Sequence, residues 1–260
     1  MTNKKYFFIG IGGIGMSSIA QYLYEKENTI LGYDASENNL VKNLVKKGIE
    51  VFNKLSLKSI PDYMKKDDVI VVYTPAIPDD NIFLKYFRKN GNRKIYKRSE
   101  ILGEISKQSK CIAIAGTHGK TTTTAIISHL FHSSGIHFKA FIGGIMKCFD
   151  SNFINTGNDY IIVEADEYDR SFLNLNPNYA VITSIESDHL DIYGDFKSLA
   201  ESFQLFTNNV KDVLITDAEI EIDIDKDFSF SIKSDSDYYV NNINILENEI
   251  RFDLKTPNNF

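Results

Sequence analysis

The chain has 260 residues, 43% of them hydrophobic, with a net charge of −6 and a sequence pI near 5.4. This length fits one or two domains, and the acidic balance argues against nucleic acid or a membrane surface as a partner. The first apolar run, residues 6–9, is too short for a membrane span or for the apolar region of a signal peptide.

The N-terminal segment has the pattern of a dinucleotide-binding unit. The strand predicted at residues 6–9 ends in a glycine turn, and a helix at about 17–26 and a strand at 29–33 follow it. In such units the glycines let a diphosphate approach the backbone, and an acid after the second strand binds a ribose hydroxyl. We therefore expect Gly12, Gly13, Gly15 and Asp34 to bind a ligand with a diphosphate and a ribose. The pattern does not separate a nicotinamide dinucleotide from a UDP-sugar.

The rest of this segment adds elements to the same sheet. We expect a helix from Ser36 to about Lys47, a strand at 69–73, and a helix that starts at Asp79 or Asp80 and ends at Gly91. The loop after the strand at 69–73 should face the ligand, because ligands bind beyond the carboxyl ends of parallel strands.

Three further residues are assigned to this ligand site. Thr74 and Ala76 lie in the loop that follows the strand at 69–73, and Arg98 begins a helix that leads out of the domain. The Arg98 guanidinium is suited to a phosphate or a carboxylate, although a solvated surface arginine fits the sequence equally well. We expect one domain over residues 1–108 and a second over residues 109–260.

The second domain opens with a phosphate-binding loop. An apolar strand at 111–114 leads into a glycine turn and then a helix, which places backbone N–H groups and the positive end of a helix dipole together. The lysine adds a positive charge, and the threonine after it is suited to hold Mg²⁺. The glycine spacing is shorter than in the strict phosphate-loop motif, so a turn that only caps a helix is the alternative. The expected nucleotide-binding residues are Gly116, Thr117, His118, Gly119, Lys120, Thr121 and Thr122.

Two more strands of this domain end in polar residues. The strand at 160–163 runs into an acidic segment that starts at Glu164, and the strand at 179–183 is followed by His189. Carboxylates this close together need a cation, so we expect a metal or Arg170 to neutralise some of them unless most face water. Strand ends of a parallel sheet share one edge, so Lys120, Thr121, Glu164 and His189 should converge. We expect Thr121, Glu164 and His189 to hold Mg²⁺ or Mn²⁺, with Lys120, Glu164 and His189 as the catalytic group.

The predicted fold class is α/β, with a Rossmann-like N-terminal domain and a parallel-sheet central domain that carries the phosphate loop. The two cysteines, Cys111 and Cys148, favour free thiols in a reducing compartment. We therefore expect a cytoplasmic protein.

Together these motifs resemble the Mur ligase family. The resemblance rests on the glycine turn at 10–16, the loop at 116–123, the acidic run at 164–173 and the segment at 187–191. It implies an ATP-dependent enzyme of peptidoglycan synthesis, which joins L-alanine to UDP-N-acetylmuramate through an acyl phosphate. A ligase that joins a whole peptide to the same sugar nucleotide is the alternative.

The resemblance also implies a third, C-terminal domain that this sequence lacks, so we expect a truncated central domain and doubtful activity in isolation. A separate polypeptide that carries the missing domain is one expected partner. An inactive nucleotide-binding remnant and a nicotinamide-dependent oxidoreductase stay open as readings from other functional classes.

Overall fold

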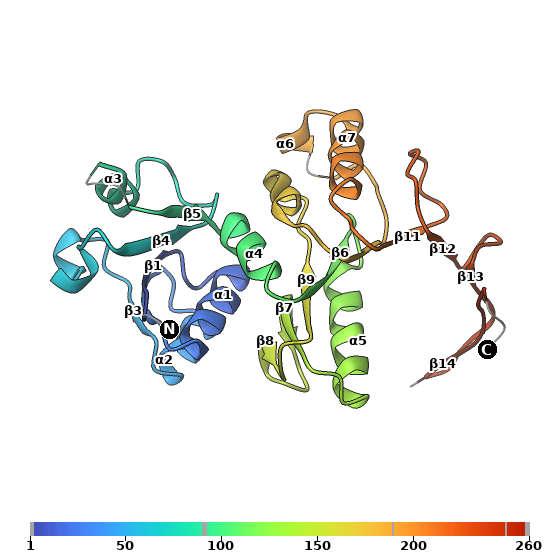
Figure 1. The fold of residues 1–260 in the computed structure, drawn as a ribbon, viewed down its shortest axis with the longest axis horizontal. Helices are drawn as coiled ribbons and strands as arrows, with labels where there is room; N and C mark the ends of the chain where they lie inside the picture. Colours follow the sequence, from blue (N-terminus) through green and yellow to red (C-terminus); the bar gives the residue numbers. More distant parts are fainter. Residues whose placement is uncertain (1–2, 90–92, 189, 248, 258–260) are drawn as a thin grey trace.

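The computed structural model describes residues 3–89, 93–188, 190–247 and 249–257, and it places two α/β units end to end (Figure 1). The first sheet has the order β3-β2-β1-β4-β5, with every pair parallel. β1 lies between β2 and β4, with Ile9 opposite both Tyr33 and Tyr73, so the three strands end together. The strands are β1 (Lys5–Ile9), β2 (Thr29–Tyr33), β3 (Glu50–Phe52), β4 (Val69–Tyr73) and β5 (Ile95–Lys97).

Helices cover both faces of this sheet. On one face, α3 packs its phenylalanines against Phe7, and on the other α1 and α4 cover Phe8. Residues 6–9 are buried on both faces, as parallel strands between helices require. The helices are α1 (Ile14–Glu25), α2 (Asn39–Lys46), α3 (Ile82–Lys89) and α4 (Arg98–Ser106).

Three helix starts differ from the sequence prediction. The helix predicted from about residue 17 begins at Ile14, with Gly13 as its N-cap. In the other two cases an asparagine side chain is the reason. The helix predicted from Ser36 begins at Asn39, because the side chain of Asn38 accepts a hydrogen bond from the Val41 N–H and caps it. The helix predicted from Asp79 or Asp80 begins at Ile82, because Asn81 accepts from the N–H groups of residues 83 and 84. The predicted end at Gly91 lies outside the described residues.

The second sheet has the order β14-β13-β12-β11-β10-β6-β9-β7-β8. Pairing is parallel from β7 through β13, whereas β8 and β14 join the two edges antiparallel. The predicted α/β class is confirmed, and the division at residue 108 stays a prediction. The strands are β6 (Lys110–Ala115), β7 (Phe138–Met146), β8 (Ser151–Asn155), β9 (Tyr160–Glu164), β10 (Tyr179–Ile182), β11 (Val213–Asp217), β12 (Phe228–Ser231), β13 (Tyr238–Ile245) and β14 (Ile250–Lys255).

The helices of the second unit lie on the two faces of this sheet. α5 (Lys120–Ser133) packs on β7 and β9, and α7 (Phe196–Thr207) packs on a 3-10 segment, Tyr168–Asn174. α6 (Leu190–Tyr193) precedes α7, whose N-cap Asp195 accepts from the Ser198 N–H. In the described part of the chain, no helix is long and apolar enough to cross a bilayer.

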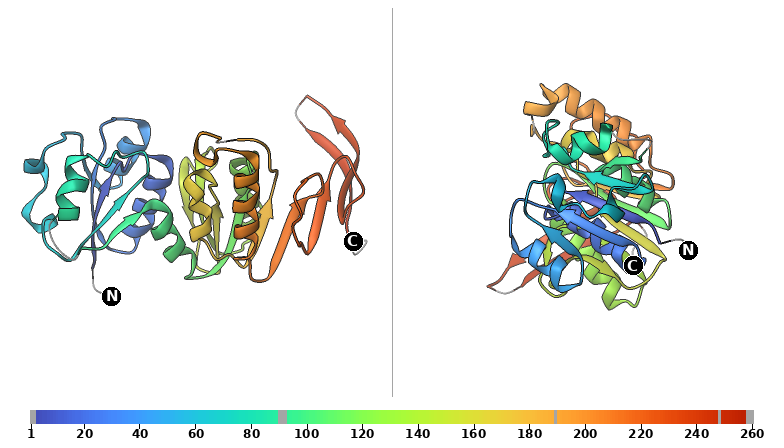
Figure 2. Two further views of the ribbon diagram at one scale, coloured as in Figure 1. Left: turned by 90° about the horizontal axis from the view of Figure 1, so that it is seen from above. Right: turned by 90° about the vertical axis from the view of Figure 1, so that its left-hand side faces the viewer.

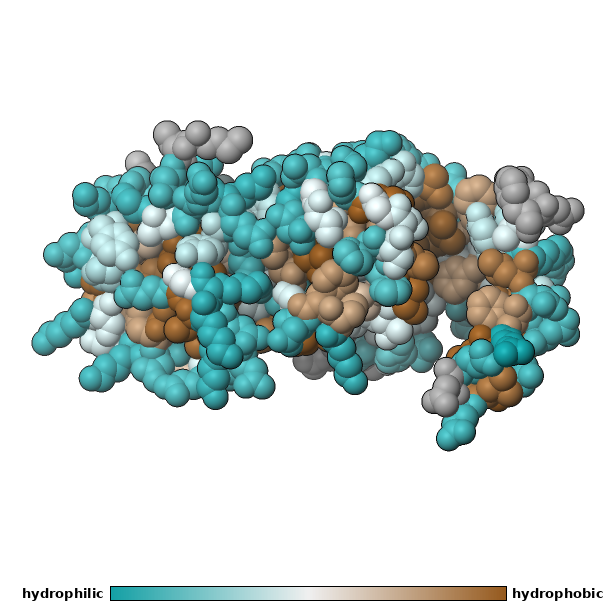
Figure 3. Space-filling model, turned by 90° about the horizontal axis from the view of Figure 1, so that it is seen from below, coloured by the Kyte–Doolittle hydropathy of each residue, from teal (hydrophilic) through white to brown (hydrophobic). Residues whose placement is uncertain are grey.

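The strands β13 and β14 extend away from the rest of the molecule (Figure 2). Their apolar side chains stay exposed, with Ile245 75% and Ile250 61% accessible. In the space-filling view, hydrophilic residues cover most of the N-terminal unit, and hydrophobic residues gather on the strands at the opposite end (Figure 3).

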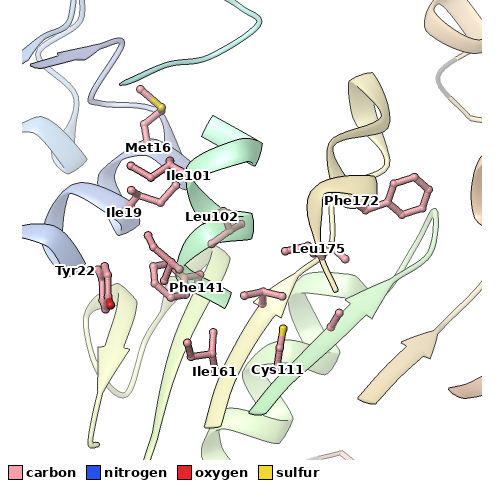
Figure 4. Packing of buried hydrophobic residues seen from close by; sticks show 14 of the residues in the cluster. Met16, Ile19, Tyr22, Ile101, Leu102, Cys111, Phe141, Ile161, Phe172 and Leu175 are labelled. Carbon is pink, nitrogen blue, oxygen red and sulfur yellow. The ribbon is translucent and has the colours of Figure 1, made fainter. Parts of the chain in front are cut away.

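One apolar core runs across the junction of the two units (Figure 4). Ile19 and Tyr22 of α1 and Leu102 of α4 pack toward Phe141 of β7, and the same cluster continues to Phe172. α1 contacts both β7 and β8, and α4 contacts the 3-10 segment. Apolar burial at this junction fixes the two units against each other.

A buried polar network lies at the edge of this junction. Asn152 of β8 is 1% exposed, and it donates from Nδ2 to the Ile14 carbonyl at 2.6 Å and to Ser17 Oγ at 2.9 Å. Its Oδ1 accepts from Gln21 Nε2 at 3.0 Å. Buried polar groups specify one docking geometry, because any other arrangement leaves them without partners.

Replacing Asn152 with alanine should lower the free energy of unfolding by about 1–3 kcal/mol, because Gln21 and the Ile14 carbonyl lose buried partners. Asn155→Ala is the matched control, since that exposed side chain makes a hydrogen bond to Glu25, and its cost should stay below about 0.5 kcal/mol. Urea denaturation measures both values. Equal costs for the two variants would show that the network does not stabilise the junction.

The two cysteines should differ sharply in reactivity. Burial raises the pKa of the Cys111 thiol to about 12, whereas Cys148 is exposed. Because the thiolate is the reactive form, iodoacetamide at about pH 8.5 should alkylate Cys148 in the folded chain and Cys111 only after denaturation. Peptide mass spectrometry distinguishes the sites, and fast labelling of Cys111 in the native chain would refute the placement of β6 in the core.

Candidate active site

The phosphate-loop prediction falls on the turn between β6 and α5. Gly116 and Gly119 have φ angles of +128° and +81°, a region that favours glycine. Gly119 is the N-cap of α5 without a side-chain cap, and the first turn of the helix has no acidic residue. The first-turn N–H groups of Lys120, Thr121 and Thr122 therefore have no intrahelical partner and suit an anion.

The segment after β10 supports the phosphate loop through hydrogen bonds. Ser184 accepts from the Thr117 N–H through its carbonyl at 3.0 Å and from the His118 N–H through its hydroxyl at 3.1 Å. The Thr183 hydroxyl donates to the carbonyls of Ala115 and His118. A Cβ on Gly116 would lie 2.1 Å from Thr183 Oγ1, so the loop can follow this support only with glycine there.

The side chain of Lys120 turns into the loop and meets a buried carboxylate. Its Nζ donates to the Gly116 carbonyl at 2.6 Å and lies 2.9 Å and 2.8 Å from the two carboxylate oxygens of Glu167. Glu167 is 1% exposed, and this burial raises its carboxyl pKa against the opposing effect of Lys120. The lysine predicted to meet the triphosphate is thus oriented along the inside of the glycine turn.

Thr121 and Glu164 lie together, as predicted. The Thr121 hydroxyl donates to Glu164 Oε1 at 2.8 Å, and the Gly143 N–H donates to Glu164 Oε2 at 2.7 Å. A Cβ on Gly143 would lie 2.5 Å from that carboxylate. A hydroxyl beside a carboxylate is an oxygen donor set of the kind that Mg²⁺ uses together with phosphate oxygens and water.

The third predicted metal ligand, His189, lies outside the described residues. Among the residues that the structure does describe, no group of three or more His, Cys, Asp and Glu side chains is placed to hold a metal. The predicted convergence of His189 with Glu164 therefore stays a prediction.

The acidic segment is neutralised by residues other than Arg170. Arg98 Nη2 lies 2.7 Å from Asp166 Oδ2, and Lys97 Nζ lies 3.0 Å from Asp169 Oδ2. Arg170 instead lies over the ring of Tyr193 and donates from Nε to Ser202 Oγ at 3.2 Å. Of the alternatives that the sequence left open, Arg170 is therefore ruled out as the partner of these carboxylates. Lys97 and Arg98 of the N-terminal unit pair with Asp169 and Asp166, and Lys120 of the second unit pairs with Glu167.

The glycine turn of the N-terminal unit is held by its predicted acid. Asp34 Oδ2 accepts from the Gly12 N–H at 2.7 Å, and Oδ1 accepts from the backbone and hydroxyl of Ser36. A Cβ on Gly12 would lie 2.9 Å from Asp34 Oδ2, so the close approach needs glycine. Asp34 thus shapes the turn, and a ribose would share its oxygens with these donors.

The other residues predicted for this ligand site differ in their exposure and in how closely they approach the glycine turn. Gly13 is exposed and forms the N-cap of α1 without a side-chain cap. Thr74 lies beside Gly10, where a Cβ would be 3.3 Å from its methyl group, whereas Ala76 is exposed on the loop. Arg98 lies against Gly15, where a Cβ would be 2.5 Å from its Nη1.

A cavity of about 180 Å³ lies between the glycine turn of the N-terminal unit and the strand ends of the second unit. It is lined by Gly15 and Arg98 from the N-terminal unit and by Gly143, Glu164 and Asp166 from the second. Glu164 is in turn hydrogen-bonded to Thr121 of the phosphate loop. The cavity thus extends from the first glycine turn to the carboxylate that contacts the phosphate loop.

Some contributors to this site were missed from the sequence. Gly143 positions Glu164, and its signal was the glycine pair at the end of an apolar strand. Ser184 supports the phosphate loop, and its signal was its place in the polar pair, Thr183 and Ser184, that follows β10. In neither case does the local sequence name the partner, because the contact forms between strands that are distant in the chain.

Comparison with known proteins decides the family. A family model described as Mur ligase family, catalytic domain, matches residues 5–110, and one described as Mur ligase middle domain matches residues 114–259. The second match alone covers more than half of the chain. The chain belongs to the Mur ligase family.

Relatives of this Mur ligase chain carry a consistent name. The UDP-N-acetylmuramate–L-alanine ligase of Christiangramia forsetii is 42% identical over 259 residues, which cover 98% of this chain and 56% of that protein. That of Porphyromonas gingivalis is 45% identical over 210 residues, which cover 80% and 46%. The chain therefore spans about half the length of the curated relatives it matches. The comparisons give no support to a separate polypeptide as partner.

Solved structures of Mur ligases share the fold. The crystal structure of UDP-N-acetylmuramate-alanine ligase from Thermotoga maritima matches with a TM-score of 0.87 at 29% identity, over 98% of this chain and 58% of that chain. A UDP-N-acetylmuramate:L-alanyl-gamma-D-glutamyl-meso-diaminopimelate ligase from Neisseria matches with a TM-score of 0.86 at 21% identity, over 98% and 85%, and this likeness shows the fold alone.

Gly116→Ala should cost far more stability than Gly135→Ala in this Mur ligase chain. Both glycines have positive φ, but a Cβ on Gly135 meets nothing within 4 Å, so only the backbone penalty of about 1–2 kcal/mol applies there. At Gly116 the clash with Thr183 should add at least about 1–3 kcal/mol. Urea unfolding compares the two, and similar losses would contradict the described contact between the loop and Thr183.

Proposed function

We propose that this chain carries the sugar-nucleotide and ATP sites of a ligase that joins L-alanine to UDP-N-acetylmuramate through an acyl phosphate. The observation that carries the proposal is the cavity at the first glycine turn, with Arg98 on one wall and, on the other, Glu164, which is hydrogen-bonded to Thr121 of the phosphate loop. The names of the relatives favour a single amino acid over a whole peptide as the incoming group.

ATP would bind on the loop from Gly116 to Thr122, with its β- and γ-phosphates against the N-terminus of α5 and the Lys120 ammonium. Thr121 and Glu164 would hold Mg²⁺ or Mn²⁺, which screens the phosphate charge when bound. His118 is exposed, and its Nε2 lies 3.7 Å from Glu186 Oε2, so we propose it as a contact at the rim of the triphosphate. A requirement for ATP also supports a cytoplasmic location.

The sugar nucleotide would lie on the N-terminal unit. Gly12, Gly13 and Gly15 would receive the diphosphate, and Asp34 a ribose hydroxyl. Thr74 and Ala76 belong to the loop that borders the turn. Arg98 would bind an anionic group of this ligand at the cavity, in exchange for or beside Asp166.

The chemistry follows from the charges that meet in the cavity. The carboxylate of the sugar nucleotide would attack the γ-phosphorus, and ADP would leave, which gives an acyl phosphate. L-alanine's amine would then attack the carbonyl carbon of that acyl phosphate, lose its proton and displace phosphate. Two anions approach each other in the first step, so fixed cations lower the barrier. Lys120 on one side and Arg98 on the other supply that preorganised positive charge.

Activity is tested by phosphate release with Mg-ATP, UDP-N-acetylmuramate and L-alanine. The proposal expects release that depends on both acceptor and amino acid. Release with L-alanyl-γ-D-glutamyl-diaminopimelate in place of L-alanine would favour the peptide-joining alternative. No substrate-dependent release would identify the chain as it stands as a nucleotide-binding remnant.

Lys120→Ala should weaken binding of Mg-AMP-PNP by about 10–100-fold, because a charge-assisted contact to phosphate is lost. Binding of UDP-N-acetylmuramate should change by less than about twofold, because its proposed contacts lie on the other unit. Calorimetric titration measures both ligands, and Lys110→Ala at the exposed start of β6 serves as the control. Parallel loss of both affinities would mean that the two ligands do not have separate anchoring units.

A further inference from the structure

Glu167 makes the closest carboxylate contact to Lys120. Both of its carboxylate oxygens lie within 2.9 Å of the Lys120 Nζ. The neighbouring acids have other partners, because Glu164 accepts from Thr121 and Asp166 pairs with Arg98. The contact is sheltered from solvent, with the lysine side chain 14% and the glutamate side chain 1% exposed.

The backbone of Glu167 is held in place by two hydrogen bonds to its carbonyl. Its carbonyl accepts from the Arg170 N–H at 2.9 Å and from the Tyr193 hydroxyl at 2.5 Å. Tyr193 is itself buried, and burial raises the pKa of Tyr193 to about 12, so its hydroxyl stays a donor. The backbone of Glu167 is therefore held by hydrogen bonds from both the 3-10 segment and α6.

The contacts of the Lys120 ammonium divide into two strong ones and one weak one. Its hydrogens reach the Gly116 carbonyl at 2.6 Å, the carboxylate of Glu167, and the Thr117 carbonyl at 3.3 Å. A phosphate oxygen can replace the longest of these without disturbing the other two. A lysine stem is flexible, so an ammonium that is already held loses less freedom when phosphate arrives.

We propose that Glu167 is a positioning residue that aims the Lys120 ammonium into the phosphate loop and stays paired with it when the triphosphate binds. This inference rests on the proposed function of the loop as an ATP site. Glu167 acts through Lys120 and touches no phosphate itself. Its effect on nucleotide affinity therefore depends on the presence of the lysine.

The test is a double-mutant cycle on the 260-residue chain, with Mg-AMP-PNP as the probe in calorimetric titrations. Glu167→Gln keeps the shape and loses the charge, so it should weaken binding about tenfold with Lys120 present. In a Lys120→Met background the same change should alter the affinity by less than about twofold. Glu104→Gln, which removes an exposed ion pair with Lys107, is the matched control and should leave the affinity unchanged.

A second variant keeps the test decisive if Glu167→Gln does not fold. Tyr193→Phe removes only the hydroxyl that holds the Glu167 carbonyl, and it should weaken binding about two- to fivefold in the presence of Lys120 and not in its absence. Equal effects with and without Lys120, or tighter binding by Glu167→Gln, would overturn the positioning role of Glu167 but not the proposed ATP site. Absence of Mg-AMP-PNP binding by the unmodified chain overturns the proposed ATP site and this inference with it.

Discussion

The parallel pairing of β6 with β9 and β10 is the constraint on which the site depends. The register sets Ile114 opposite Glu164, and it sets Ala115 opposite Ile182, so all three strands end at one level. The phosphate loop, the acidic segment and the supporting residues Thr183 and Ser184 then meet at that edge. A slip of one residue would turn the inward side chains outward and separate Thr121 from Glu164.

A second constraint, the packing of α1 and α4 on the second unit, gives this edge its partner. The apolar cluster and the Asn152 network hold the N-terminal glycine turn against the edge of the second sheet. Arg98 uses this docking to reach across to Asp166. Both units therefore determine the charge of the acidic segment, since two of its carboxylates are paired with cations of the first unit.

The sequence predicted the parts of this site that local patterns encode. Strands that end in glycine or acidic residues, and the Gly-Lys-Thr turn, carry their own signals, so the loop and the proximity of Thr121 and Glu164 followed from them. The helices that begin at Asn39 and Ile82 were predicted to start two or three residues earlier, because several nearby residues can cap a helix equally well. Partners such as Gly143 for Glu164 and Arg98 for Asp166 depend on tertiary contacts that no short segment specifies.

We propose that Thr121 and Glu164 form the divalent-cation site beside a bound triphosphate. Crystals of the chain grown with Mn²⁺ and AMP-PNP test it directly, because anomalous scattering locates the manganese. We expect a manganese peak about 2 Å from Thr121 Oγ1 and from a Glu164 carboxylate oxygen, beside the phosphates on the 116–122 loop. Manganese and phosphates bound elsewhere, with the Thr121–Glu164 hydrogen bond intact, would contradict it.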